Sequence, residues 1–150
     1  MTPSLEVSVA LANDTDFARL APLWARDVLG GVDSTPMNET RAARQIQKHF
    51  EEGCDFWIAS NSTAPLGFAY GQQIGGAYEL SWVYVEPEIR NRGIGTELAR
   101  AVASYAQGRG ASHLSMVFAK DDRPSRALVE ALCRTQTRVE IEPSQARIIF

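Results

Sequence analysis

The chain has 150 residues, of which 45% are hydrophobic and 22% are charged, and its formal net charge is −3. This length and composition are typical of one globular domain with a hydrophobic core, so we expect a single domain over residues 1–150. The slightly acidic balance disfavours nucleic acid as a partner, and no apolar run is long enough to span a membrane. The N-terminus has no basic segment followed by an apolar stretch, so we expect a cytoplasmic protein without a secretory signal.

The metal-binding residue types are sparse and scattered. Cys54 and Cys133 lie far apart without metal-type spacing, and His49 and His113 have no partner at ligand spacing. We therefore expect two reduced thiols and no metal cofactor.

The N-terminal half predicts a strand, two helices and a β-hairpin. Alternating apolar and polar residues indicate a strand over residues 5–12. Asn13-Asp14 and Thr15 can cap a helix with apolar residues at helical spacing as far as Val28, and Gly30-Gly31 would end it. Asn38 is expected to cap a second helix, which runs to Phe50 and is ended by a glycine. The predicted hairpin strands are residues 56–59 and 66–72.

The C-terminal half predicts an alternation of strands and helices. A Gly75-Gly76 turn leads into a strand at residues 78–85, and a helix follows from about Gly93 to Gln107. The remaining expected elements are a strand at 113–118, a helix from Asp121 with Pro124 in its first turn, and two strands at 137–141 and 146–150 around Pro143-Ser144.

The turn between the strand at 78–85 and the following helix carries the most informative motif, Arg90-Asn91-Arg92-Gly93-Ile94-Gly95. Gly93 and Gly95 lack side chains, so backbone N–H groups there can approach a ligand closely. These N–H groups open a helix, where four donors have no internal partner and the dipole end is positive. Together with Arg90 and Arg92, this pattern predicts a site for phosphate or pyrophosphate.

Two other phosphate-binding patterns fit this turn less well. A Walker A loop needs a lysine after its second glycine, and no lysine follows Gly95. A dinucleotide-binding fingerprint needs a third glycine where this chain has Leu98. A turn whose glycines serve only the backbone shape remains the alternative interpretation.

This segment resembles the acyl-CoA-binding motif of the GNAT N-acetyltransferase superfamily. In that family a strand ending in a hydrophobic-x-Pro pattern, here Val85-Glu86-Pro87, precedes (Gln/Arg)-x-x-Gly-x-(Gly/Ala), here residues 90–95. The resemblance implies an α/β fold with a mixed, strongly twisted sheet of about seven strands, flanked by helices on both faces. It also implies acetyl-CoA as cosubstrate and direct acetyl transfer to a primary amine. We favour a small-molecule amine over a protein amine, and homodimers are common in the family.

The resemblance further assigns roles to individual residues. The pantetheine arm of the coenzyme would pair with the backbone of Val83, Tyr84 and Val85. Ser125 would touch the coenzyme from the start of the last helix. The residues expected around the pyrophosphate are Arg90, Asn91, Arg92, Gly93, Ile94, Gly95 and Thr96.

Glu79 is the candidate catalytic base. It lies eleven positions before Arg90, where the histone-acetyltransferase branch of the family carries its catalytic glutamate. Strand alternation places Glu79 on the same face as Val83 and Val85, unless a bulge intervenes. A strand-end glutamate that faces solvent is the alternative interpretation.

The second motif of the family, Asn-x-x-Ala-x-x-x-Tyr in the last helix, is degenerate here. Alignment on Ala127 puts Pro124 at the Asn position and Ala131 at the Tyr position, so the usual general acid is missing. Tyr84 and Tyr105 could donate a proton instead, although both fit core aromatics better. A non-catalytic acyl-CoA-binding or sensing module is therefore the competing function.

The acceptor site is only weakly indicated. Trp24, Trp57 and Trp82 are expected in the core, with a minor chance that one lines an acceptor pocket. Asp27 flanks a loop that in this family often helps to form the acceptor site, together with two further carboxylates, Asp33 and Glu39. Carboxylates there would suit a cationic amine, but ordinary surface acidity is the more common explanation.

Overall fold

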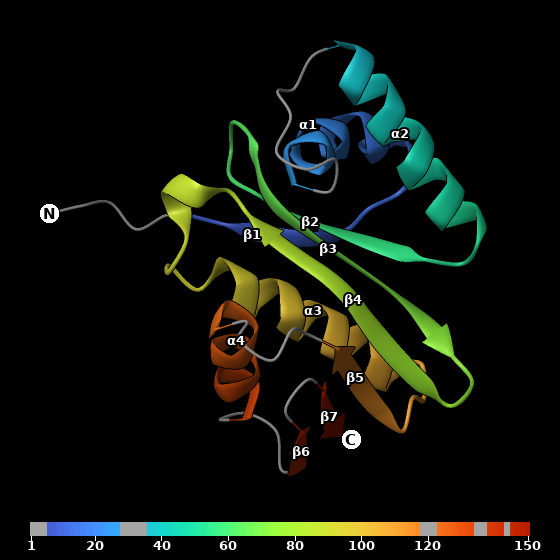
Figure 1. Cartoon of the computed structure of the whole chain (residues 1–150), viewed down its shortest axis with the longest axis vertical. Coiled ribbons are helices and arrows are strands. Elements are labelled where there is room, and N and C mark those ends of the chain that lie inside the picture. Colours follow the sequence, from blue (N-terminus) through green and yellow to red (C-terminus); the bar gives the residue numbers. More distant parts are fainter. Residues whose placement is uncertain (1–5, 28–35, 118–122, 134–137, 143–144) are drawn as a thin grey trace, which may run out of the picture.

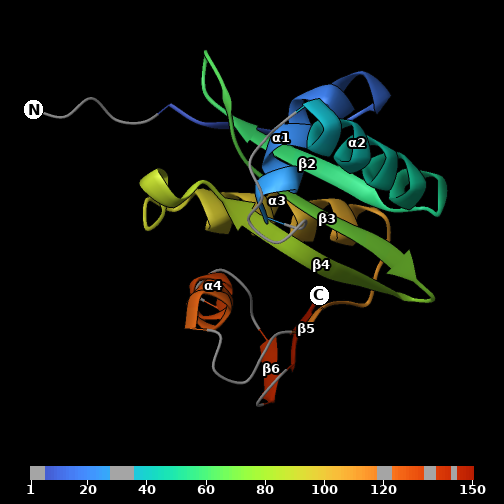
Figure 2. The same cartoon turned by 45° about the horizontal axis from the view of Figure 1, so that its top comes forward.

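The structure, a computed structural model, describes residues 6–27, 36–117, 123–133, 138–142 and 145–150. It contains one seven-stranded sheet with the order β1-β2-β3-β4-β5-β7-β6, in which only the β4–β5 pairing is parallel. Helices α1 and α2 cover one face of the sheet, and α3 and α4 lie on the other (Figures 1 and 2). The predicted α/β fold, with a mixed sheet between helices, is confirmed.

The elements follow one another along the chain in the order that Figure 1 labels. The strands are β1 (Ser8–Leu11), β2 (Asp55–Ser60), β3 (Pro65–Ile74), β4 (Ala77–Val85), β5 (His113–Val117), β6 (Arg138–Glu142) and β7 (Gln145–Ile149). The α-helices are α1 (Phe17–Asp27), α2 (Pro36–Glu51), α3 (Ile94–Gly108) and α4 (Arg123–Cys133). Two short 3-10 helices, η1 (Asp14–Asp16) and η2 (Pro87–Ile89), precede α1 and α3.

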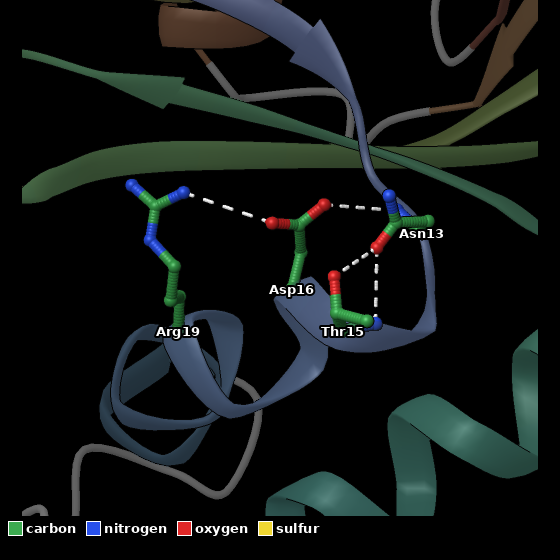
Figure 3. A network of polar contacts seen from close by, with 4 residues as sticks. All are labelled: Asn13, Thr15, Asp16 and Arg19. Carbon is green, nitrogen blue, oxygen red and sulfur yellow. Dashed lines mark hydrogen bonds and ion pairs between the residues drawn. The ribbon is translucent and has the colours of Figure 1, made fainter.

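A reciprocal cap begins the first helical segment, as Figure 3 shows. The Asn13 side chain accepts the Thr15 backbone N–H at 3.0 Å, and the Asp16 carboxylate accepts the Asn13 backbone N–H at 3.0 Å. Arg19 extends this network through a 3.7 Å ion pair with Asp16. Of the three residues predicted to cap this helix, Asn13 is the N-cap, whereas Asp14 and Thr15 lie in the first turn, a 3-10 helix that continues into α1.

The start of the second helix differs from the prediction. Helix α2 begins at Pro36, so Asn38 lies inside its first turn and the expected cap at Asn38 is wrong. Proline suits the first helical turn because its φ is already helical and its missing N–H would have had no partner there. The predicted positions that lie outside the described residues are Leu5, Val28, Gly30-Gly31, Asp33, Phe118, Asp121, Thr137 and Pro143-Ser144.

The sheet separates two hydrophobic cores. The core under α1 and α2 is rich in aromatic residues, and the Trp24 ring stacks on Phe68 with centroids 5.6 Å apart. The core under α3 and α4 is largely aliphatic and includes Leu98, Leu114 and Ile148, all fully buried. Burial of this apolar surface is the main contribution that holds the helices on the sheet.

A β-bulge part-way along β4 reverses which of its side chains point to each face of the sheet. Tyr70 of β3 pairs with Trp82, whereas the next residue, Gly71, pairs with Leu80, so Ser81 is an extra residue on β4. The residues of β4 that pack in the α3 core are therefore Tyr78 and Leu80 before the bulge and Val83 and Val85 after it.

The bulge moves Glu79 to the opposite face from the one expected. Because Glu79 lies between two residues of the α3 core, it faces α1 and α2, as do Trp82 and Tyr84 beyond the bulge. The prediction that Glu79 shares a face with Val83 and Val85 is therefore wrong.

Candidate active site

A cleft with a volume of about 380 Å³ lies along the second half of β4, the turn before α3 and the middle of α4. It brings together most of the residues that the sequence motif singled out, with several others. The cleft is lined by Asp27, Trp82, Val83, Tyr84, Val85, Ile89, Arg90, Asn91, Gly93, Ile94, Gly95, Thr96, Ala127 and Leu128. Its volume is in the range of pockets that bind small molecules and cofactors.

The cleft exists because β4 and β5 pair over only part of their length. The parallel ladder covers Tyr78 to Leu80, and β4 continues beyond it to Val85 (Figure 1). Along 81–85, no described residue pairs with this edge of β4, whereas β3 pairs with the other edge throughout. A strand edge that presents its own N–H and C=O groups can accept an extended ligand as an added strand.

The turn before α3 has a left-handed backbone at two positions. Asn91 has φ of 64° and Gly93, the N-cap of α3, has φ of 83°. Gly93 provides no side chain to cap the helix, so the first N–H groups of α3 are available to an anionic ligand. The predicted phosphate site depends on such free N–H groups at the start of the helix, and it stays a prediction.

Gly95 lies against β4 across the floor of the cleft. A Cβ atom built on Gly95 would meet Val83 Cγ1 and Val85 Cγ2 at 3.8 Å each, which is ordinary van der Waals contact. A larger side chain at this position would extend from the helix start into the space beside β4. The absence of a side chain keeps the turn and the open strand edge in one continuous cleft.

The two arginines of the motif are placed differently. Arg90 Nε donates a hydrogen bond to the Val85 carbonyl at 2.8 Å, and its guanidinium carbon lies 5.7 Å from the centre of the Tyr84 ring. Arg90 thus fastens the turn to the end of β4 and adds positive charge to the cleft. Arg92 is exposed and does not line the cleft.

Tyr84 is buried and bonded to a carboxylate. Its hydroxyl and Glu86 Oε2 are 3.2 Å apart, and Glu86 also forms an ion pair with Arg26 of α1. Burial, and then the negative charge of Glu86, raise the pKa of the Tyr84 hydroxyl. Tyr84 is therefore a weaker acid than a free tyrosine, and Tyr105 does not line the cleft.

The remaining sequence candidates lie at the margin of the cleft or beyond it. Glu79 is half-buried, pairs with Gln72 across the β3–β4 ladder and is not among the lining residues. Ala127 of α4 lines the cleft, but Ala131, at the position of the family tyrosine, does not. The backbone of Ser125 belongs to α4, and its side chain lies outside the described residues.

Asp27 and Trp82 form the end of the cleft farthest along β4 from the turn. The Trp82 side chain is 43% exposed and its indole N–H donates a hydrogen bond to Asp27 Oδ2, so the expectation that Trp82 is a core residue is wrong. Trp24 and Trp57 are buried as expected. Partial burial raises the pKa of Asp27, and the Trp82 hydrogen bond and the charge of Arg90 oppose this shift.

The described part of the chain contains no group of three or more His, Cys, Asp or Glu side chains placed to hold a metal ion. Within it, no helix combines the length and the apolar character needed to cross a membrane.

Solved structures resemble this chain over nearly its whole length. A GNAT-family acetyltransferase from Desulfovibrio desulfuricans superposes with a TM-score of 0.65 at 20% identity and covers 96% of both chains. A phosphinothricin acetyltransferase from Sinorhizobium meliloti in complex with AcCoA gives a TM-score of 0.72 at 20% identity, covering 96% of this chain and 88% of its own. A ribosomal-protein-alanine N-acetyltransferase from Brucella melitensis gives 0.71 at 16%, with 95% and 99% covered.

Sequence comparison matches this chain to a family and to no individual curated protein. No curated protein sequence matches the chain at a significant level. The model of the acetyltransferase (GNAT) family matches residues 19–133, which is more than half of the chain and includes β4, the turn and α3. The chain therefore belongs to the GNAT acetyltransferase family.

Proposed function

We propose that this protein transfers an acetyl group from acetyl-CoA directly to a primary amine of a small molecule. The observation that supports this best is the continuous cleft in which the open edge of β4 leads to the uncapped start of α3. An extended amide-containing arm ending in a pyrophosphate matches these two features in order. When bound, acetyl-CoA supplies the activated acetyl thioester.

The residues present fit this coenzyme. The backbone of Val83 to Val85 would pair with the pantetheine arm, and the N–H groups of residues 91–96 would hold the pyrophosphate. Arg90 contributes positive charge near the turn, and exposed Arg92 can reach phosphate from outside the cleft. Ser125 stays a prediction as a further contact at the start of α4.

The amine must lose a proton before it attacks, because a protonated alkylamine has a pKa of about 10 and carries no lone pair. We propose Glu79 as the base for this step. Since Glu79 faces α1 and α2 and does not line the cleft, the proton would pass to it through water. A backbone N–H of β4 beside the thioester would stabilise the developing oxyanion.

The acceptor end supports a small molecule better than a peptide. Asp27 is the one acidic side chain among the described lining residues, and Trp82 is the one exposed ring beside it. One carboxylate beside one aromatic ring would recognise a small molecule that carries a single amine. A protein amine would be expected to need an extended surface of further contacts.

A non-catalytic acyl-CoA sensor is the second candidate. Ala131 has no hydroxyl, and Tyr84 is made a weaker acid by burial and Glu86, so no described residue is an evident acid for the leaving thiolate. A thiolate can leave without such an acid because a thiol has a pKa near 8.5, but the reaction would then be slower.

Calorimetric titration of the purified protein with acetyl-CoA tests the proposal, with desulfo-CoA and adenosine diphosphate as comparisons. We expect saturable binding at one site, weaker for the diphosphate, followed by thiol release when primary amines are added. No binding by folded protein would overturn the proposal, whereas binding without turnover of any amine would favour the sensor. Unchanged turnover in Glu79→Gln would exclude Glu79 as the base.

A further inference from the structure

The cleft carries opposite charges at its two ends. The turn before α3 presents helix N–H groups and Arg90, which suit an anionic ligand. The other end presents Asp27 of α1, held beside Trp82 of β4. The distance along β4 from Val85 to Trp82 is three residues, or roughly 10 Å. The structure thus separates an anion-binding end from a carboxylate-bearing end within one cavity.

The described residues give the Asp27 carboxylate one hydrogen bond and no ion pair. Its Oδ2 accepts the Trp82 indole N–H, and no described residue forms an ion pair with it. Among the described residues, the charged and titratable groups whose electrostatics are coupled to Asp27 include Arg90, Tyr70 and Tyr84. Its pKa is raised because desolvation outweighs the Trp82 hydrogen bond and the attraction of Arg90. A cationic ligand would relieve this desolvated negative charge.

Trp82 supplies the second element of a cation site. Trp82 is 43% exposed and lines the cleft, although it is a large apolar residue on a strand. The indole hydrogen bond to Asp27 holds the ring beside the carboxylate. An exposed indole next to a carboxylate suits an ammonium group, which is attracted by the carboxylate charge and by the ring quadrupole.

We propose that Asp27 and Trp82 together bind the acceptor of the reaction as a cation, so that the substrate class is small primary amines that are protonated at neutral pH. This inference rests on the proposed function, because it places the acceptor at the end of a coenzyme cleft. It assigns specificity to Asp27 and Trp82, and it leaves proton removal from the amine as a separate step.

The test compares cationic and neutral acceptors in the wild-type protein and in Asp27→Asn. Benzylamine, putrescine and L-lysine are the cationic probes, and aniline is the neutral comparison for benzylamine because it has the same ring and is uncharged at pH 7. We expect acetylation of at least one cationic probe in preference to aniline. In Asp27→Asn the KM for that probe should rise at least about tenfold, because the ammonium group would lose its charge-assisted hydrogen bond to the carboxylate.

The controls separate a binding role from a structural one. Asparagine keeps an oxygen for the Trp82 N–H, and the Kd for acetyl-CoA should stay within twofold of wild type. Glu51→Gln removes one exposed carboxylate of α2 that does not line the cleft, and it should leave KM unchanged. Asp27→Glu should restore part of the affinity, which a purely structural defect would not do.

Two results would overturn the inference while the proposed function stands: an unchanged KM in Asp27→Asn, or a preference for aniline over every cationic probe. Binding of acetyl-CoA without turnover of any amine, aniline included, is a different failure, because it favours the sensor. Loss of acetyl-CoA binding in the wild-type protein would refute the proposed function and this inference with it, and calorimetry with acetyl-CoA distinguishes these last two cases.

Discussion

The two ends of the cleft are built in different ways. The end at the turn is made mainly of backbone from one continuous segment, residues 89–96, with two left-handed residues and an uncapped helix start. The other end is made of two side chains, Asp27 and Trp82, which are brought together from α1 and β4 across 55 positions of sequence. A local motif thus forms the end at the turn, whereas tertiary packing forms the carboxylate-bearing end.

This difference suggests which ligand preference can vary between related sequences: the preference at the end made of side chains, and not the one at the turn. The turn offers glycines and main-chain N–H groups, which under the proposed function would hold any ligand with a pyrophosphate in the same way. The other end depends on which side chains α1 and β4 carry, so under the same proposal the choice of acceptor could change without altering the turn. The following predictions test this contrast, from the largest expected effect to the smallest.

Gly71→Ala should disrupt both ends, because it acts on the strand pair that carries the bulge. A Cβ on Gly71 would lie 2.3 Å from the Glu79 carbonyl oxygen and 2.8 Å from Tyr78 Cε1. We expect a loss of about 3 kcal/mol of folding stability, or about 10 °C in melting temperature. Gly76→Ala, in the open turn of the same hairpin, should change stability by less than about 0.5 kcal/mol. Similar melting temperatures for both variants would contradict this account of the bulge.

Gly95→Val should damage the anion-binding end alone. Its Cβ meets β4 side chains only at ordinary contact distance, so the protein should fold, while the added methyl groups occupy the cleft. We expect the Kd for acetyl-CoA in calorimetry to rise at least about tenfold, which is about 1.4 kcal/mol. Gly108→Val, at the open far end of the same helix, is the matched control and should bind normally. Normal binding by Gly95→Val would mean that the coenzyme lies elsewhere.

Asp27→Asn should have a small effect on stability with a definite sign. An acid whose pKa is higher in the folded protein than in the unfolded chain costs stability once it ionises. That cost appears as the pH rises from the unfolded pKa through the folded pKa. Urea unfolding should therefore show Asp27→Asn slightly more stable than wild type at pH 7 and equal to it at pH 3. Lower stability of the variant at pH 7 would show that Asp27 has a structural role instead.

The sequence was informative where structure is local. The motif at residues 90–95, the strand before it and the helix after it could be predicted because glycine, proline and apolar spacing act over short distances. The Asn13 cap was predictable for the same reason. The first turn of α2 shows the limit of this approach, because Pro36 and Asn38 both carry start signals and the proline sets the boundary of the described helix.

The sequence was misleading where pairing between distant segments decides. The bulge at Ser81 is set by the register of β4 against β3, and no residue of β4 alone reveals it. Without it, Glu79 is assigned to the face of Val83, and Trp82 has no evident reason to be exposed. Trp82 reaches the cleft because the bulge reverses the alternation and Asp27 accepts its N–H, a contact that only the fold creates.

The ion pair between Arg26 and Glu86 has a consequence for how α1 is attached to β4. Arg26 precedes Asp27 on α1, and Glu86 lies at the end of β4 just before the turn. Arg26 and Asp27, which are consecutive residues of α1, thus contact β4 at two places: Arg26 contacts Glu86, just before the turn, and Asp27 contacts Trp82. The Arg26 side chain is 43% exposed and the Glu86 side chain 14%, so solvent screens only one side of the pair. Through this contact α1 is joined to β4 at the residue that precedes the turn.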